Sequence, residues 1–135
     1  MNKRSNLPDN IIQVDNYLIY TDLSYYIQTL PSKDDTEDDE TLACLQRKRI
    51  NNNQGESQEL IKTYYKCVNN KFNKCFIKQK GYYYSIISSY DANCLNYSEE
   101  KIYMDYSKDN NKYELFIIKN GKISTQYNNS KSLSN

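Results

Sequence analysis

The chain has 135 residues, a length that suits one domain and is too short for two. Its 18 lysine and arginine side chains nearly balance 17 acidic ones, so the net charge of +1 gives no field that would recruit nucleic acid or an anionic membrane. No apolar run approaches the roughly 18 residues of a membrane span, and the polar start of the chain does not resemble a signal peptide. We expect a single domain over residues 1–135, with polar termini at 1–9 and 128–135.

The chain holds 15 tyrosines, which carry much of the apolar area that leucine, valine and phenylalanine normally supply. Glycine (3) and proline (2) are scarce, whereas asparagine, lysine and isoleucine are abundant. An AT-rich coding sequence produces this composition, so the tyrosines by themselves do not indicate a ligand site.

Short apolar runs occupy residues 11–14, 17–20 and 24–30, and they are too short and too aromatic to favour helices. The run 24–30 predicts a strand that ends at Pro31, because proline offers no amide to a ladder. We interpret the acidic stretch 32–40 as a solvated hairpin loop. A cation site is the alternative interpretation, although this stretch lacks the glycine of an EF-hand loop.

Two further strands are predicted in the middle of the chain, at 41–50 and 59–67, with turn-forming residues at 51–55 between them. In the second strand, alternate residues share one face, and this face should point inward. Its residues are Ile61, Thr63, Tyr65 and Cys67.

The last third of the chain shows the clearest strand pattern, because tyrosine and isoleucine alternate with polar residues. Segments 74–78 and 82–90 predict a tight hairpin around Gly81. Another strand is predicted at 102–106.

The dipeptide Asn120-Gly121 predicts a hairpin that folds residues 114–119 onto 122–127. Both of its residues can take positive φ, which a type I′ turn requires. About eight short strands with hairpin-length connections predict an all-β fold, a small antiparallel barrel, with a β-sandwich as the alternative. Parallel pairing would need crossover helices, and the sequence offers none.

Four cysteines form an even set, which permits two disulfides with three possible connectivities. They are Cys44, Cys67, Cys75 and Cys94. Disulfides are favoured over free buried thiols. Metal is the least favoured interpretation, because the chain has no Cys-x-x-Cys spacing and no histidine.

The composition also excludes several kinds of chemistry. Without histidine, no hydrolase can use an imidazole base, and no metal centre can rely on imidazole ligands. The three glycines are isolated, so the chain has neither a phosphate-cradling loop nor a dinucleotide fingerprint. We therefore expect a binding or interaction protein rather than an enzyme, with no cofactor and no metal.

Several of these features, read in order, resemble the salivary lipocalins of ticks. The matching residues are Tyr25-Tyr26, Ala43-Cys44-Leu45, Tyr64-Tyr65, Asn93-Cys94 and Tyr113-Glu114-Leu115-Phe116. In that family a cysteine near the end of one strand is followed, after a variable loop, by a Glu-Leu-aromatic triplet on the next. The resemblance covers about residues 16–118 and implies an eight-stranded barrel with room for one small ligand.

By this resemblance, Glu114 is an amine-contacting carboxylate and Phe116 replaces an aromatic residue of the family. Tyr26 and Tyr65 would add aromatic faces to the same cavity. The alternative for Glu114 is a solvated strand carboxylate opposite Lys122, and for Phe116 it is ordinary core packing.

The resemblance implies a secreted, monomeric scavenger that sequesters a host lipid mediator or a biogenic amine. The sequence would then be a processed form that lacks its signal peptide, although a cytoplasmic origin stays open. The residue after the family cysteine is Leu95 rather than an acid, which favours an apolar ligand over a simple amine. The second hypothesis is a β-sandwich interaction module of a virus or parasite with an AT-rich genome.

Overall fold

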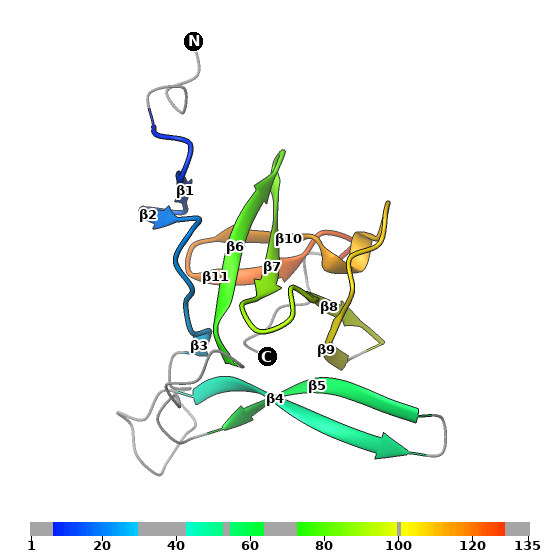
Figure 1. The fold of residues 1–135 in the computed structure, drawn as a ribbon. Coiled ribbons are helices and arrows are strands. Elements are labelled where there is room, and N and C mark those ends of the chain that lie inside the picture. Colours follow the sequence, from blue (N-terminus) through cyan, green and yellow to red (C-terminus); the bar gives the residue numbers. More distant parts are fainter. Residues whose placement is uncertain (1–6, 30–42, 53–54, 64–72, 100, 129–135) are drawn as a thin grey trace.

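The computed structural model describes residues 7–29, 43–52, 55–63, 73–99 and 101–128 (Figure 1). In chain order the strands are β1 (Ile11–Val14), β2 (Tyr17–Tyr20), β3 (Gln28–Thr29), β4 (Ala43–Asn52), β5 (Gly55–Thr63), β6 (Cys75–Lys80), β7 (Tyr83–Ser88), β8 (Cys94–Ser98), β9 (Lys101–Asp105), β10 (Phe116–Lys119) and β11 (Lys122–Thr125), with the 3-10 helix η3 (Lys112–Glu114) before β10. The strand pairs are all antiparallel, so the prediction of an all-β antiparallel fold is confirmed.

Tight hairpins form where the sequence permits positive φ. In β10–β11, Lys119 pairs with Lys122 across Asn120 (φ 55) and Gly121 (φ 73), which confirms the predicted Asn-Gly turn. Gly81 (φ 65) lies in the turn of β6–β7, the second predicted hairpin.

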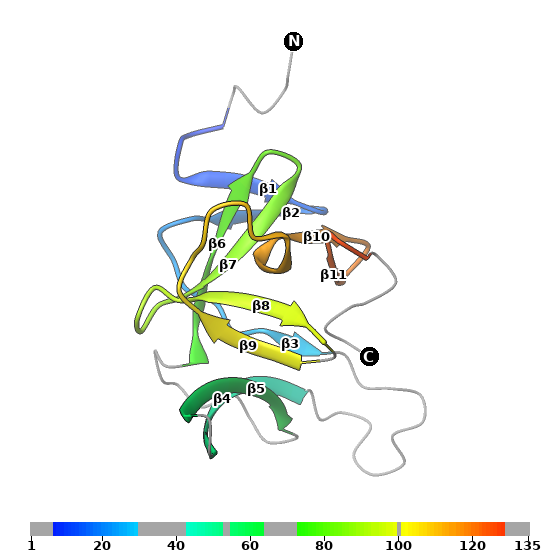
Figure 2. The same cartoon turned by 90° about the vertical axis from the view of Figure 1, so that its right-hand side faces the viewer.

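The runs at 11–14 and 17–20, which the sequence left without an assignment, form a third hairpin. It is a separate two-stranded sheet, β1–β2, whose turn holds Asp15 at φ 57. An aspartate adopts this left-handed conformation more readily than most residues do. In both views this hairpin lies at the opposite end of the fold from β4–β5 (Figures 1 and 2).

The strands β4 and β5 form the longest pair, from Cys44 opposite Thr63 to Asn52 opposite Gly55. Both predicted middle strands therefore exist. The acidic stretch 32–40 and the end of the second predicted strand, 64–67, lie outside the described residues.

The remaining strands form one sheet with the order β11-β10-β7-β8-β9-β5-β4-β3, and β6 pairs with β7. As a ladder of strands this sheet is open. Two strands share one edge of β7, because β10 pairs with Tyr84 and β8 pairs with Ile87. An isolated bridge joins Tyr25, just before β3, to Cys75 at the start of β6.

Two parts of the chain repeat the same arrangement. Cys44-Leu45 in β4 and Cys94-Leu95 in β8 are both buried, and each cysteine pairs with a residue of an earlier strand, Gln28 of β3 and Ile87 of β7. A tyrosine lies three residues before each of those partners, and it pairs with the first residue of a later hairpin, β6–β7 or β10–β11. These tyrosines are Tyr25, opposite Cys75, and Tyr84, opposite Phe116. The fold therefore contains an internal repeat that unequal loop lengths conceal in the sequence.

The core gathers side chains from strands on both sides of the β7–β8 pair. Its buried members are Leu45, Cys75, Ile86, Leu95, Tyr97, Met104 and Phe116. Both leucines of the repeat belong to it, so burial of the repeated Cys-Leu pairs connects the two parts of the sheet.

Candidate functional site

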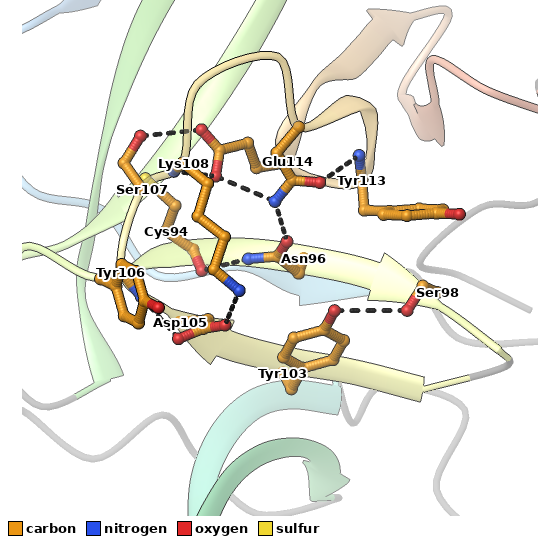
Figure 3. Close-up of polar contacts among 11 residues, drawn as sticks. Cys94, Asn96, Ser98, Tyr103, Asp105, Tyr106, Ser107, Lys108, Tyr113 and Glu114 are labelled. Atoms are coloured by element: carbon orange, nitrogen blue, oxygen red, sulfur yellow. Dashed lines mark hydrogen bonds and ion pairs between the residues drawn. The ribbon is translucent and has the colours of Figure 1, made fainter.

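The carboxylate of Glu114 is buried and fully engaged by its own loop. The residue is 3% exposed and ends η3. Its Oε1 accepts a hydrogen bond from Ser107 Oγ at 2.8 Å, and its Oε2 accepts bonds from Asn111 Nδ2 at 3.2 Å and from the Lys108 amide at 3.3 Å (Figure 3). Hydrogen bonds from several donors to an ionised acceptor are the arrangement that a buried carboxylate needs.

The same network ties this loop to the sheet. Asn111 Nδ2 also donates to Asn96 Oδ1 at 2.9 Å, and Asn96 Nδ2 donates to the Cys94 carbonyl at 3.0 Å (Figure 3). Asn111 caps η3 by accepting from the Tyr113 amide at 3.0 Å. Glu114 therefore anchors the connection from β9 to β10 onto β8.

This geometry corrects the expected strand position of Glu114. The strand β10 begins at Phe116, and Lys122 pairs with Lys119, so Glu114 is not a solvated carboxylate opposite Lys122. The signal was present in the sequence as Asn-x-x-Glu at 111–114, a spacing typical of a helix start. An amine ligand of Glu114 would have to displace its present donors.

Phe116 is 0% exposed and belongs to the core, which agrees with its packing interpretation. Tyr26 is half-buried, and the Lys74 ammonium lies 5.2 Å from the centroid of its ring. Tyr65 lies outside the described residues. The three predicted ligand-binding residues that the structure describes, Glu114, Phe116 and Tyr26, do not line the groove described below.

The cysteines do not form two disulfides as expected. Cys44 is disulfide-bonded, whereas Cys75 and Cys94 are both buried thiols. Cys67 lies outside the described residues.

A bond between Cys75 and Cys94 is excluded by the register. They pair with Ser88 and Ile87 on opposite edges of β7, so they lie two strands apart, about 10 Å, with side chains on opposite faces. A disulfide needs Cα atoms within about 7 Å.

The Cys94 thiol is held in its protonated form. Burial raises its pKa, and the negative charge of Glu114 raises it further, while a hydrogen bond with Ser107 acts in the opposite direction. Because the thiolate is the reactive species, this cysteine is less reactive at neutral pH than an exposed thiol.

An open groove of about 470 Å³ lies between the start of β1 and the strand β6. Four apolar side chains line it, and so do four polar ones: Ile12, Phe76, Ile77 and Ile87, with Asp9, Thr21, Lys78 and Gln79. A smaller hollow of about 190 Å³ shares Asp9, Ile12 and Gln79 with it. Small-molecule sites commonly have about 300–1,000 Å³ and this kind of lining. Sequence reasoning missed the groove because its walls come from distant segments.

Three hydrogen bonds position the β1–β2 hairpin that forms one wall. Tyr84 Oη donates to the Gln13 carbonyl at 3.1 Å, and the Gly121 amide donates to Asp15 Oδ2 at 2.9 Å. The Tyr20 amide donates to Tyr25 Oη at 3.1 Å. The hairpin is therefore fixed to β7 and to the β10–β11 turn.

An apolar strip is exposed on and just after β2. Its members, which we call the β2 strip, are Tyr17 (70% exposed), Leu18 (57%), Tyr20 (44%) and Leu23 (52%). Leu18 and Tyr20 share one face of β2, and Tyr17 lies on the other. Exposed apolar side chains that gather on one face are typical of contact surfaces.

Among the residues that the structure describes, no three His, Cys, Asp or Glu side chains gather closely enough to hold a metal ion. No helix in the described ranges is long and apolar enough to cross a membrane.

Comparison with known proteins gives a fold likeness alone. The chain matches a solved structure titled "PSL1a-E64 complex" with a TM-score of 0.57 and 12% sequence identity. The match covers 78% of this chain and 37% of that one, so this chain spans about a third of that protein's length. No protein-family model and no curated protein sequence matches the chain.

Proposed function

We propose that this protein is a secreted, non-enzymatic scavenger that sequesters a small amine with an apolar body. The groove between β1 and β6 is the proposed site, and the observation that carries the proposal is its lining. Asp9, just before β1, lines the groove, and so do four apolar side chains from β1, β6 and β7. A carboxylate attracts an ammonium group, and apolar walls bury the rest of the ligand.

The proposed site differs from the residues that the lipocalin resemblance implies. Glu114 and Phe116 are occupied by internal contacts, whereas the groove is open to solvent and contains its own acid. Asp9 thus supplies the acidic group that Leu95 lacks, which favours an amine over a purely apolar lipid mediator. The lipid mediator is the second ligand class of the same proposal.

The proposal includes the small antiparallel barrel that the sequence predicts. It is supported by the Tyr25–Cys75 bridge, in which each amide donates to the other carbonyl at 2.8 Å. The strands pair in the order β6, β7, β8, β9, β5, β4 and β3. The bridge then joins Tyr25, just before β3, to the start of β6. The bridge covers the β6 edge at Cys75, and a barrel needs pairing of this kind between its first and last strands. The resemblance to tick lipocalins itself stays a prediction.

Titration with serotonin, histamine and a fatty-acid-derived mediator tests the proposal, with tyrosine fluorescence or calorimetry as the readout. We expect Asp9→Asn to weaken amine binding about tenfold, because an ammonium loses its charged partner. Asp22→Asn is the matched control, since Asp22 is an exposed aspartate outside the groove. The proposal fails if no amine or lipid binds, and the assignment of Asp9 fails if both variants behave alike.

A second candidate function is the protein-interaction module, and the β2 strip favours it. A photo-crosslinking amino acid at Leu18 tests this candidate in an extract of the native source. Specific capture of one protein that a crosslinker at exposed Tyr82 does not capture, together with silence in the ligand titrations, would favour the module over the scavenger.

A further inference from the structure

We infer that the groove between β1 and β6 takes a short extended peptide, whose backbone adds to the outer edge of β6. The inference rests on the proposed function in one respect, because it uses the same groove, and it names the ligand class. Three observations carry it: the direction of the β6 amides, the position of the groove along the strand, and the charges in the groove walls.

The hydrogen bonds of Cys75 fix the direction of the amides along β6. Its amide and carbonyl both bond to Tyr25, so they point away from β7. Backbone groups of an antiparallel strand alternate between its two edges, so those of Ile77 and Gln79 also point outward. On the other edge, the Lys74 carbonyl accepts from the Ser89 amide, as this alternation requires.

The chain's own continuation does not use these outward groups. Continuing the register of the Tyr25 bridge would place Leu23 opposite Ile77, and Thr21 opposite Gln79. Instead, the Leu23 amide donates to the Tyr20 carbonyl, and the Thr21 amide donates to the Asn10 carbonyl at 2.8 Å. Within the described ranges, Ile77 and Gln79 therefore offer an unfilled antiparallel ladder.

The groove follows this edge and also reaches over one face of the sheet as far as Ile87 of β7, which pairs with Phe76. Consecutive β6 residues, from Phe76 to Gln79, line it. Successive side chains of a strand point to opposite faces, so a cavity over one face would be lined by alternate residues only. A ligand in the groove is thus beside the outward amides and carbonyls.

The groove walls contain one acidic and one basic side chain, Asp9 and Lys78. A short peptide carries the complementary pair, an N-terminal ammonium and a C-terminal carboxylate. The apolar lining suits its side chains. Strand addition of this kind draws affinity from main-chain hydrogen bonds and specificity from pockets for alternate side chains.

The test uses the tetrapeptide Ala-Val-Ala-Val and two copies of it, each N-methylated at one of two adjacent internal amides. Adjacent amides of a strand point to opposite sides, so one methyl group should block pairing with β6 and the other should not. We expect one copy to bind about tenfold more weakly than the parent and the other to stay within about twofold. In amide NMR spectra, the signals of Ile77 and Gln79 should shift more than those of Phe76 and Lys78.

Each outcome separates this inference from the proposed function. Equal binding of all three peptides, or binding without the Ile77 and Gln79 shifts, overturns the strand-addition mode. Serotonin binding without peptide binding overturns this inference and leaves the proposed function intact. Peptide binding without amine binding supports the inference and overturns the amine as ligand, and binding of neither overturns both.

Discussion

The hydrogen-bond network of Glu114 makes a sharp prediction, because two substitutions of the same residue should have different effects. Glutamine has nearly the shape of glutamate and can keep every bond. Its oxygen can accept from Lys108 and Asn111, while its amide nitrogen donates to the Ser107 hydroxyl, which can rotate to accept. Alanine removes the acceptor from all three donors.

The magnitudes follow from the number and type of bonds. A hydrogen bond to a charged group contributes about 1.5–3 kcal/mol, and a neutral one about 0.5–1.5 kcal/mol. Ser107 and Lys108 are exposed, so water replaces part of what Glu114→Ala removes. We expect Glu114→Ala to lower the free energy of unfolding by about 3 kcal/mol and Glu114→Gln by about 1 kcal/mol.

Urea unfolding followed by tyrosine fluorescence measures both effects as changes of midpoint at constant slope. Asp109→Ala, an exposed acid in the same loop, is the control and should lie within about 0.5 kcal/mol of the parent. The reasoning is refuted if alanine costs no more than glutamine at position 114. It is also refuted if the control variant loses as much stability as Glu114→Ala.

Three more predictions concern the core and the cysteines. Phe116→Ala should cost about 4 kcal/mol in urea unfolding, because it empties a fully buried site, whereas Tyr82→Ala, at a 90% exposed position, should cost almost nothing; similar losses would contradict the assigned core. Because the pKa of Cys94 is raised in the fold above the ordinary thiol value of 9.0, its contribution to stability is present below pH 9.0 and is lost as pH rises above it. Stability measured between pH 8 and pH 10.5 should therefore fall more steeply for the parent than for Cys94→Ala, and parallel curves would count against this. Peptide mapping without reductant should find alkylated thiols at Cys75 and Cys94 after unfolding but not at Cys44, and a bridged Cys94 would contradict the structure.

Some of the candidate site was visible in the sequence without being recognised. The pairs Cys44-Leu45 and Cys94-Leu95 were present, but the connections around them differ in length, so no fixed period revealed the repeat. The Asn111-x-x-Glu114 spacing marked a helix start inside a segment predicted as strand. The strand pattern of the neighbouring β10, which begins two residues later, extended the predicted strand over this helix start.

The sequence by itself determined many of the local elements of this protein. Alternating side chains and the Asn120-Gly121 turn predict strands and hairpins, because pleat and turn conformations depend on neighbouring residues alone. Tertiary structure decided everything that requires distant segments to meet. The strand order separates Cys75 from Cys94, so that they do not form a disulfide. Tertiary packing also buries Glu114 and places Asp9 beside β6, where it lines the groove. Such contacts depend on the order of the strands in the sheet. An alternating sequence fixes the face of the sheet on which a side chain lies, but it does not fix which strand lies beside it.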